Sequence, residues 1–422
     1  MEELSRVESE RVAGNGLLHR RLFLTAGAAA IGAAAVAGRA AAEPLAVEPW
    51  MKTPGAPFNG YGQPSRYEEK VARTFASAPG TGGTGSSRTP HHLLNGMITP
   101  SGLHYERSHS GIPDINPDAH RLLVHGLVKQ PLVFTLDDLG RYPMQSRIAF
   151  LECAGNSGVL FAKQPAATNV QAIHGLLSCS EWTGVKLSVL LEEAGVDPAA
   201  KWVLAEGADA AGMSRSFPLE KALDDAMICL YQNGERVRPA NGYPMRLLLP
   251  GFEGNMNVKW LRRIKLTAGP TMTKDETSKY TVLLPSGKAL QFVFPMEAKS
   301  MITHPSPGLT VRGPGLYEIS GLAWSGYGKV AKVEVSADGG RSWGEAALQE
   351  PVLSKAVTRF RMAWQWDGRP AVLQSRCTDD TGYVQPSRDQ LITLRGDRGQ
   401  YHNNMIQSWA VAGNGEVKNV YA

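Results

Sequence analysis

The chain has 422 residues, of which 43% are hydrophobic and 20% charged, and its formal net charge is +5 at pH 7. A chain of this length exceeds what one hydrophobic core organises, so we expect two domains with terminal extensions. The composition excludes a disordered chain, and because there is no dense block of lysine and arginine, we expect no nucleic-acid partner.

Residues 1–42 have the pattern of an export signal. The pair Arg20-Arg21 precedes a weakly hydrophobic run rich in alanine and glycine, which closes with an A-x-A site at Ala40 to Ala42. These features are typical of a secretory signal rather than a spanning helix, so we expect no membrane span in the mature protein. The arginine pair resembles a twin-arginine signal, which predicts export to the periplasm of a protein already folded around a cofactor.

Residues 43–90 are rich in proline, glycine and serine and end in "SAPGTGGTGSSRTP", which predicts a flexible, loop-like extension. Residues 91–290 mix short strands and helices. "HRLLVHGLV" alternates like a strand, "LSVLLEEAG" is typical of a helix closed by Gly195, and "PMRLLLPG" and "VKWLRRIKLTA" predict two further strands. We expect one mixed α/β domain here.

Residues 291–410 change to short strands with turn signals about every ten residues. Val333 and Val335 alternate with Glu334, and the Asp338-Gly339-Gly340 run is a hairpin turn signal. This pattern predicts an immunoglobulin-like β-sandwich, followed by a C-terminal tail at residues 411–422. The fold class expected for the whole chain is therefore α+β.

The four cysteines, Cys153, Cys179, Cys229 and Cys377, show no C-x-x-C spacing, so neither a zinc pair nor a redox motif is indicated. No C-x-x-C-H occurs, so no covalent haem is expected in this chain. The four cysteines could instead form two disulfides, if the protein works in an oxidising compartment.

Cys153 lies between the apolar "RIAFLE" and the turn-forming "AGNSG". One interpretation is a buried structural thiol, because free cysteine packs as a small hydrophobe. A second is a nucleophile with a histidine base from "TPHHLL" or "SHSGIP", although no local signature accompanies it. A third is a soft metal ligand. Since no cluster of further sulfur or histidine ligands is evident, the metal would bring its remaining ligands, as a molybdenum–pterin cofactor does.

"FLECAGNS" resembles the sulfite oxidase family of molybdenum enzymes, whose members bind the metal through one cysteine in a C-A-G-N context. The resemblance extends to "YERSHSGIP", "NGYPMRLLLPGFEGNMNVKWLRRI" and "AWSGYGKVAKVEVSADGGRSW", in that order, over roughly residues 90 to 400. It implies a molybdopterin-binding oxidoreductase domain at 91–290 and a dimerisation sandwich at 291–410. Among branches of the family, the chain looks closest to the sulfane dehydrogenase subunit of the periplasmic thiosulfate-oxidising (Sox) system.

The resemblance also implies roles for single residues. Cys153 would be the molybdenum ligand, Arg107 the substrate-side cation, Tyr280 the active-site phenol, and Lys329 a second substrate-side cation in place of a common arginine. Arginine and lysine suit phosphate oxygens, and a carboxylate suits pterin N–H groups. The residues expected to bind the molybdopterin are Tyr105, Arg107, Ser108, His109, Cys153, Asp209, Asn241, Arg246, Asn257, Val258 and Lys259.

Three departures from the family pattern concern the substrate. Gly158 stands where free-sulfite enzymes carry an arginine, Asn241 where they carry a histidine, and a tryptophan of theirs has no counterpart. A wider, less cationic pocket favours sulfane sulfur on a carrier-protein cysteine. Oxidation of free sulfite with cytochrome c as acceptor is the alternative, and a secreted, non-enzymatic binding protein with a buried Cys153 is the second alternative.

Partners follow from the resemblance and from the missing haem motif. Electrons are expected to leave to a c-type cytochrome subunit, and a sulfur-carrier protein is expected to present the substrate. Homodimerisation through the C-terminal domain would then give a heterotetramer.

Overall fold

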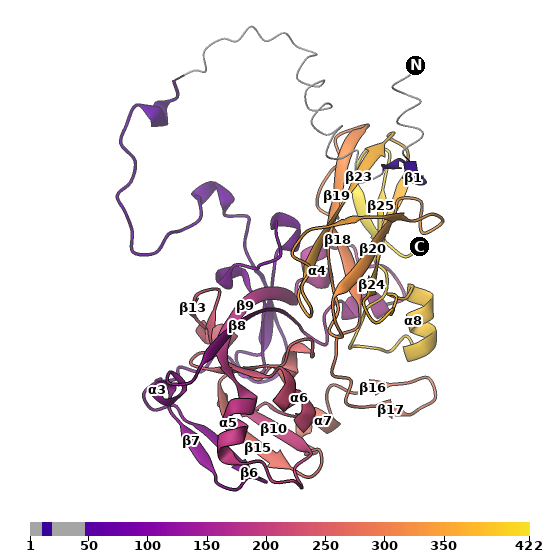
Figure 1. The fold of residues 1–422 in the computed structure, drawn as a ribbon. Coiled ribbons are helices and arrows are strands. Elements are labelled where there is room, and N and C mark those ends of the chain that lie inside the picture. The colour runs from indigo at the N-terminus through magenta and orange to yellow at the C-terminus, as the bar shows by residue number, and fades with distance from the viewer. Residues whose placement is uncertain (1–10, 19–46) are drawn as a thin grey trace.

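Two five-stranded sheets form the framework of the first domain in the computed structural model, which describes residues 11–18 and 47–422 (Figure 1). The first sheet contains, in spatial order, β11 (Ser214–Pro218), β10 (Trp202–Gly207), β15 (Leu261–Thr267), β6 (Leu122–Gly126) and β7 (Leu132–Phe134). In this sheet β15 and β6 run parallel, and the other neighbours are antiparallel.

The second sheet is antiparallel. Its order is β13 (Glu235–Arg236), β12 (Met227–Gln232), β9 (Leu177–Lys186) and β8 (Met144–Glu152), and β14 (Arg246–Leu248) pairs with β12. One cluster of buried side chains joins both sheets, with Val124, Val203 and Ile264 from the first and Ile228 and Leu247 from the second. The strands predicted around residues 122, 246 and 261 are thereby confirmed.

Short helices cover this core. The predicted helix is α5 (Leu187–Ala194), whose apolar side buries Leu190 and Leu191, and it ends at Gly195, which has a φ of +69° that favours glycine. The other helices of the first domain are α3 (Leu136–Leu139), α4 (Val170–His174), α6 (Leu219–Asp224) and α7 (Lys274–Thr277). A small hairpin, β16 (Val282–Leu283) with β17 (Ala289–Leu290), precedes the second domain.

The last part of the predicted loop-like extension is not a loop. Residues 74–88 form a hairpin of β3 (Thr74–Ser77) and β4 (Gly85–Arg88), and β4 pairs in turn with β5 (Glu106–Ser108). The glycines of "GTGGTG" supply the turn, where Gly80 and Gly83 have positive φ. Pairing with β5 supplies hydrogen-bond partners to the backbone of this polar segment, and no pattern in its sequence predicts that pairing.

The second domain is a sandwich of two antiparallel sheets, as expected (Figure 1). One sheet contains β23 (Thr358–Trp366), β19 (Gly315–Trp324) and β18 (Lys299–His304), with β22 (Ala347–Leu348) beside β23. The other contains β21 (Gly344–Glu345), β20 (Val330–Ser336), β24 (Ala371–Asp379), β25 (Ser408–Val411) and β26 (Val417–Val420). Helix α8 (Arg388–Arg395) lies between β24 and β25 in the chain. The α+β class is confirmed.

Residues 411–422 do not form a tail. β26 pairs with β25 from Ser408 to Val411 and is the last strand of the sheet, and Val417 is 4% exposed. The alternation of Val417 and Asn419, buried, with exposed Lys418 is a strand pattern too short to stand out in the sequence.

The two domains share apolar and charged contacts. Phe150, Leu160 and Ile173 of the first domain belong to the same buried cluster as the sandwich core. Next to Cys153, the buried Glu152 carboxylate accepts hydrogen bonds from Lys299 Nζ (2.9 Å) and Trp324 Nε1 (2.6 Å) of the second domain. The end of β8 is therefore fixed by both domains.

The expected export signal lies mostly outside the described residues, including Arg20-Arg21 and the stretch Ala40 to Ala42. Its described part forms β1 (Arg11–Ala13) and β2 (Leu17–Leu18), which lie on the sandwich beside β23. Over the described ranges, none of the helices combines the length and the apolar character needed to cross a membrane.

Candidate active site

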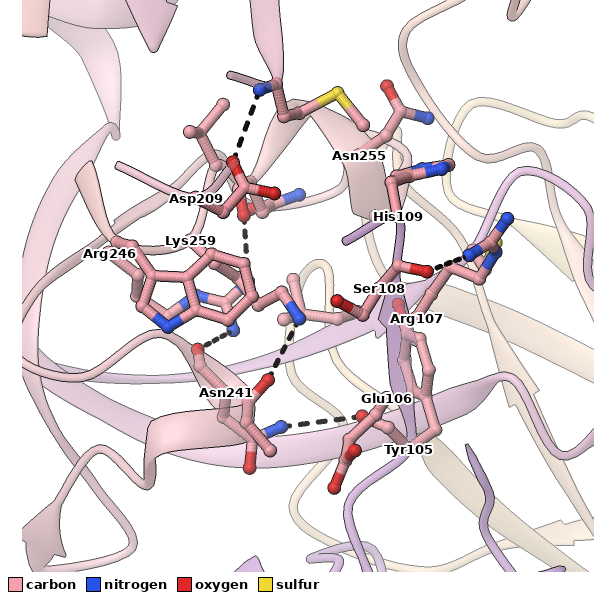
Figure 2. A pocket seen from close by; sticks show the side chains of 18 of the residues that line it. Tyr105, Glu106, Arg107, Ser108, His109, Asp209, Asn241, Arg246, Asn255 and Lys259 are labelled. Carbon is pink, nitrogen blue, oxygen red and sulfur yellow. Dashed lines mark hydrogen bonds between the residues drawn. The ribbon is translucent and has the colours of Figure 1, made fainter. Parts of the chain in front are cut away.

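A cavity that is partly open to solvent lies in the first domain, with about 680 Å³ of empty space that includes part of the open solvent (Figure 2). It is walled by the segment from His104 to His109, the end of β8, the loop after β10 and the segment from Ala240 to Trp260. The predicted residues that line it are Tyr105, Arg107, Ser108, His109, Cys153, Asp209, Asn241, Arg246, Asn257, Val258, Lys259 and Tyr280.

Cys153 is half-buried and begins the turn that follows β8. Its amide donates to Leu176 O (2.9 Å), its carbonyl accepts from the Asn156 amide (2.8 Å), and the Asn156 side chain bridges the Glu152 carboxylate and the Leu176 amide. The C-A-G-N turn thus holds the cysteine by its backbone and leaves the sulfur facing the cavity. Burial raises the pKa of the Cys153 thiol, and the Gly155 amide and Arg107 only partly offset this rise. The thiolate therefore needs a bound cation to compensate its charge.

Arg107 lies on β5 and donates to the carbonyl oxygens of Gly85 (3.2 Å) and Ser108. The β3–β4 hairpin, in the segment expected to be a loop, therefore helps to orient this cation. Next to it, His109 Nε2 lies 3.2 Å from the Tyr280 hydroxyl. Burial and then Arg107 lower the pKa of His109 to about 4, so this histidine is neutral at pH 7 and can accept from the phenol.

Arg246 and Lys259 lie along the opposite wall from Arg107 and His109 (Figure 2). Arg246 donates to the carbonyl oxygens of Asn241 (2.7 Å) and Asn257 (2.9 Å), and Lys259 donates to that of Ala240 (2.9 Å). Burial lowers the pKa of Arg246 to about 10 and that of Lys259 to about 7. Since their contacts are to neutral carbonyls, an anion bound here would stabilise both charges.

The other predicted binding residues shape the walls. Asn257 uses its side chain on the Phe252 and Glu253 carbonyls and the Leu249 amide, so it fixes the loop rather than offering free donors. Asp209 accepts from Ser110 Oγ (3.1 Å) and the Met213 amide (3.4 Å), which leaves its carboxylate at the cavity rim.

Buried polar atoms without partners show what kind of ligand fits. Arg246 Nε, His104 Nε2 and Asn255 Oδ1 line the cavity and have no hydrogen-bond partner. An unpaired buried polar group costs on the order of 1–3 kcal/mol, so a ligand rich in donors and acceptors is favoured. A pterin with a phosphate group meets this need, and the cations of the wall suit its phosphate. In the described part of the chain, no group of three or more His, Cys, Asp or Glu side chains could hold a metal ion.

Lys329 is the exception among the predicted residues, because it does not line the cavity. It directly precedes β20 and is exposed to solvent, whereas the neighbouring Val330 is 3% exposed and belongs to the sandwich core. The structure therefore does not bring Lys329 to the cavity with the other predicted residues, and its role as a second substrate-side cation stays a prediction.

Sequence reasoning missed residues that the fold brings to the site. His104, Asn255 and Trp260 line the cavity, and each lies within or beside a quoted motif. Tyr401 and His402 come from the second domain: the Tyr401 ring lies 5.3 Å from that of Tyr280. No local pattern in "RGQYHNN" signals this contact across more than a hundred residues.

The same segment closes the turn after Cys153. The His402 amide donates to Ala154 O (2.8 Å), and its Nε2 lies 2.8 Å from a Glu253 carboxylate oxygen. A Cβ atom on Gly158 would lie 3.0 Å from Gln400 O, so little room exists for a larger side chain there.

Two family models match the chain: "Oxidoreductase molybdopterin binding domain" over residues 109–274 and "Mo-co oxidoreductase dimerisation domain" over residues 291–409. Mitochondrial sulfite oxidase of Rattus norvegicus is 31% identical over 295 residues, which cover 66% of this chain and 53% of the relative. Nitrate reductase [NADH] of Solanum lycopersicum is 33% identical over 315 residues, covering 66% and 34%. The chain thus spans about half or less of the length of these curated relatives.

Among solved structures, the chain matches the crystal structure of the sulfane dehydrogenase SoxCD from Paracoccus pantotrophus with a TM-score of 0.87 and 45% identity. The match covers 89% of this chain and 97% of the other. The matched models confirm the molybdenum–molybdopterin cofactor class inferred from the cysteine motif and the cavity. The chain belongs to the sulfite oxidase family of molybdenum–pterin oxidoreductases.

Proposed function

We propose that this protein oxidises sulfane sulfur held on the cysteine of a carrier protein and passes the electrons to a c-type cytochrome subunit. The observation that carries the proposal is the match to the sulfane dehydrogenase SoxCD, at 45% identity over nearly all of that chain. We further propose a periplasmic location, reached by twin-arginine export, and dimerisation through the second domain, whose family model carries that description.

The access to the cavity and the change at one expected arginine support a substrate presented by a carrier protein. Gly158 stands where free-sulfite members are expected to carry an arginine, so one cation of those members is absent from the turn that follows Cys153. The cavity is partly open to solvent, with Arg107 among its lining residues, so a sulfur atom on a flexible carrier arm can approach it. Arg107 remains as the cation that attracts an anionic sulfur group.

The residues have separable tasks in this proposal. Cys153 would hold the molybdenum, and Arg246 and Lys259 would hold the phosphate of the pterin; when bound, the cofactor accepts two electrons from the substrate sulfur and releases them singly. Arg107 would orient the substrate. Tyr280, paired with the neutral His109, would donate or accept a proton next to the reacting sulfur.

A comparison of two substrates tests the proposal. The holoenzyme is given either a carrier protein bearing a cysteine persulfide or free sulfite, with the same cytochrome c as electron acceptor. We expect kcat/KM for the carrier-bound sulfur to exceed that for sulfite by at least about tenfold, which corresponds to about 1.4 kcal/mol.

Free sulfite is the second candidate function, favoured by the 31% identity to the rat sulfite oxidase. A higher kcat/KM for sulfite than for the carrier-bound sulfur would establish it in place of the first. Turnover of neither substrate by a preparation with about one molybdenum per chain would contradict both.

A further inference from the structure

The segment of residues 11–18 is built into the sandwich. β2 pairs with β23 at Leu17 and Trp364, and the Gln365 amide donates to Gly16 O (2.8 Å). Trp364 Nε1 donates to Asn15 O (2.8 Å), and Asn15 Nδ2 donates to Ala337 O (2.8 Å). Backbone and side-chain contacts thus fix this segment to β23 and to the turn that follows β20.

The segment covers an exposed sheet edge. On one side β23 pairs along its length with β19, whereas on the other side β22 covers only Phe360 and Arg361. The stretch from Trp364 onward is covered by residues 15–17. An uncovered edge offers unpaired amides and carbonyls to any extended peptide, so this stretch is a site for an added strand.

The contacts require particular residues in this segment. Leu17 is 0% and Leu18 4% exposed, and Leu17 joins the sandwich core. Gly16 has a φ of +85°, and a Cβ atom there would lie 1.9 Å from Gln365 O, so glycine is required. Nonspecific packing of a leader would not need such a residue.

We propose that this edge of the second domain is a binding site for the chain's own residues 11–18, and that it holds the expected export signal against the folded domain. The inference rests on the proposed export, because residues 11–18 directly precede the Arg20-Arg21 pair in the sequence. The site exists only once β23 has formed beside β19. Retention of the segment therefore reports that the second domain has folded, which suits an exporter of folded proteins.

Hydrogen–deuterium exchange of the full chain tests the binding. The precursor is produced in cells without the twin-arginine exporter, and exchange is measured in peptides covering residues 11–18 and 360–367. In the unaltered chain both peptides should be protected. In Gly16→Ala both should exchange at least about tenfold faster, whereas Arg11→Gln, at an exposed position of the same segment, should match the unaltered chain.

A synthetic peptide of residues 9–19 supplies the second measurement. Added to the Gly16→Ala chain, it should restore protection of residues 360–367, and the same peptide carrying Gly16→Ala should not. Lack of protection of residues 11–18 in the unaltered chain, or equal protection in Gly16→Ala, would overturn the proposed site.

Export is measured separately, so that the two proposals fail separately. A chain with Arg20→Lys and Arg21→Lys should keep the protection of residues 11–18 but lose accumulation in the periplasm. Undiminished accumulation would refute the export signal and leave the peptide site standing as an intramolecular one.

Discussion

Arg246 and Lys259 lie in the cavity wall with carbonyl oxygens, not carboxylates, as their hydrogen-bond acceptors. A carbonyl satisfies the N–H group but leaves the positive charge uncompensated, so the wall keeps its attraction for an anion. Each residue also lies close to an aromatic ring, Arg246 over Trp182 at 4.8 Å and Lys259 over Trp260 at 4.3 Å. The face of each ring attracts the cation but carries no net charge, so the positive charge stays uncompensated.

Replacing Cys153 by serine should abolish activity, because a hydroxyl is a poor ligand for a soft metal. Removing only a hydrogen-bond partner of a metal ligand lowers metal affinity or activity by about 10- to 100-fold. We therefore expect removal of the ligand itself to lower kcat by at least about 100-fold. Molybdenum per chain is measured beside activity. Cys179→Ala, at a cysteine buried away from the cavity, is the control and should keep its molybdenum.

Arg107 and Lys329 should separate in their effects on an anionic substrate. Arg107→Ala should raise KM by roughly tenfold or more, since a hydrogen bond to a charged group contributes about 1.5–3 kcal/mol, and Arg107→Lys should restore part of the loss. Lys329→Ala should leave KM within about twofold, because its side chain points to solvent. A large rise in KM for Lys329→Ala would return this residue to the site.

Lys259 should make anion binding depend on pH. Its pKa is lowered to about 7, first by burial and then by Arg246, and a bound phosphate favours the charged form. In the cofactor-free protein, affinity for a phosphate monoester should therefore fall as pH rises above about 7, by at most tenfold per pH unit. Lys259→Met should bind weakly at every pH, without this slope.

The same titration predicts stability with the opposite sign. The folded pKa is about 7 and the unfolded value 10.5, so between them the unfolded chain binds the additional proton. The free energy of unfolding of the cofactor-free protein should then rise with pH in this window, by at most about 1.4 kcal/mol per pH unit from this group. Thermal unfolding at pH 6.5 and 8.5, compared between the unaltered chain and Lys259→Met, measures it.

Glu152 links two elements, the end of β8 and the strand pair β18 and β19. Its carboxylate and Lys299 are both buried, and such a pair is costly to break from one side, because the other charge is left uncompensated. The turn that presents Cys153 begins at the next residue. The position of the metal ligand therefore depends on a contact with the second domain.

Glu152→Gln should lower the free energy of unfolding by about 3 kcal/mol, whereas the double variant Glu152→Gln with Lys299→Met should recover most of that loss. Denaturant unfolding of both single variants and the double variant forms the cycle. Additive losses in the two single variants would show that the pair does not interact.

Prediction from sequence succeeded where a segment carries its own periodicity or motif. β6, α5 and the hairpin at Asp338 follow from alternation and turn residues, and Cys153 follows from its motif. It failed where a distant partner decides the structure. β4 is a polar segment after a glycine-rich turn, and it forms a strand because β3 and β5 pair with it. Tyr401 reaches Tyr280 only because the domains pack together. Lys329 was expected at the site from the family resemblance, and no local pattern indicates that its side chain is exposed outside the cavity.

The two domains form one continuous interior. Phe150 and Ile173 extend the sandwich core into the first domain, and Lys355 of the second domain lies 2.7 Å from Asp225 of the first. Neither domain would keep its interface buried alone. We therefore expect a single calorimetric transition with equal calorimetric and van't Hoff enthalpies, and two resolved transitions would contradict this shared core.

The crossing of the segment from Gly399 to His402 over the cysteine turn sets an order on biosynthesis. Because a ribosome delivers the chain from its N-terminus, the first domain emerges and begins to fold before these residues exist. The His402 contact with Ala154 can form only after the strands from β18 to β24 and α8 have been translated. Until then the turn that presents Cys153 lacks these contacts, so we expect this turn to become fixed only late in the synthesis of the chain.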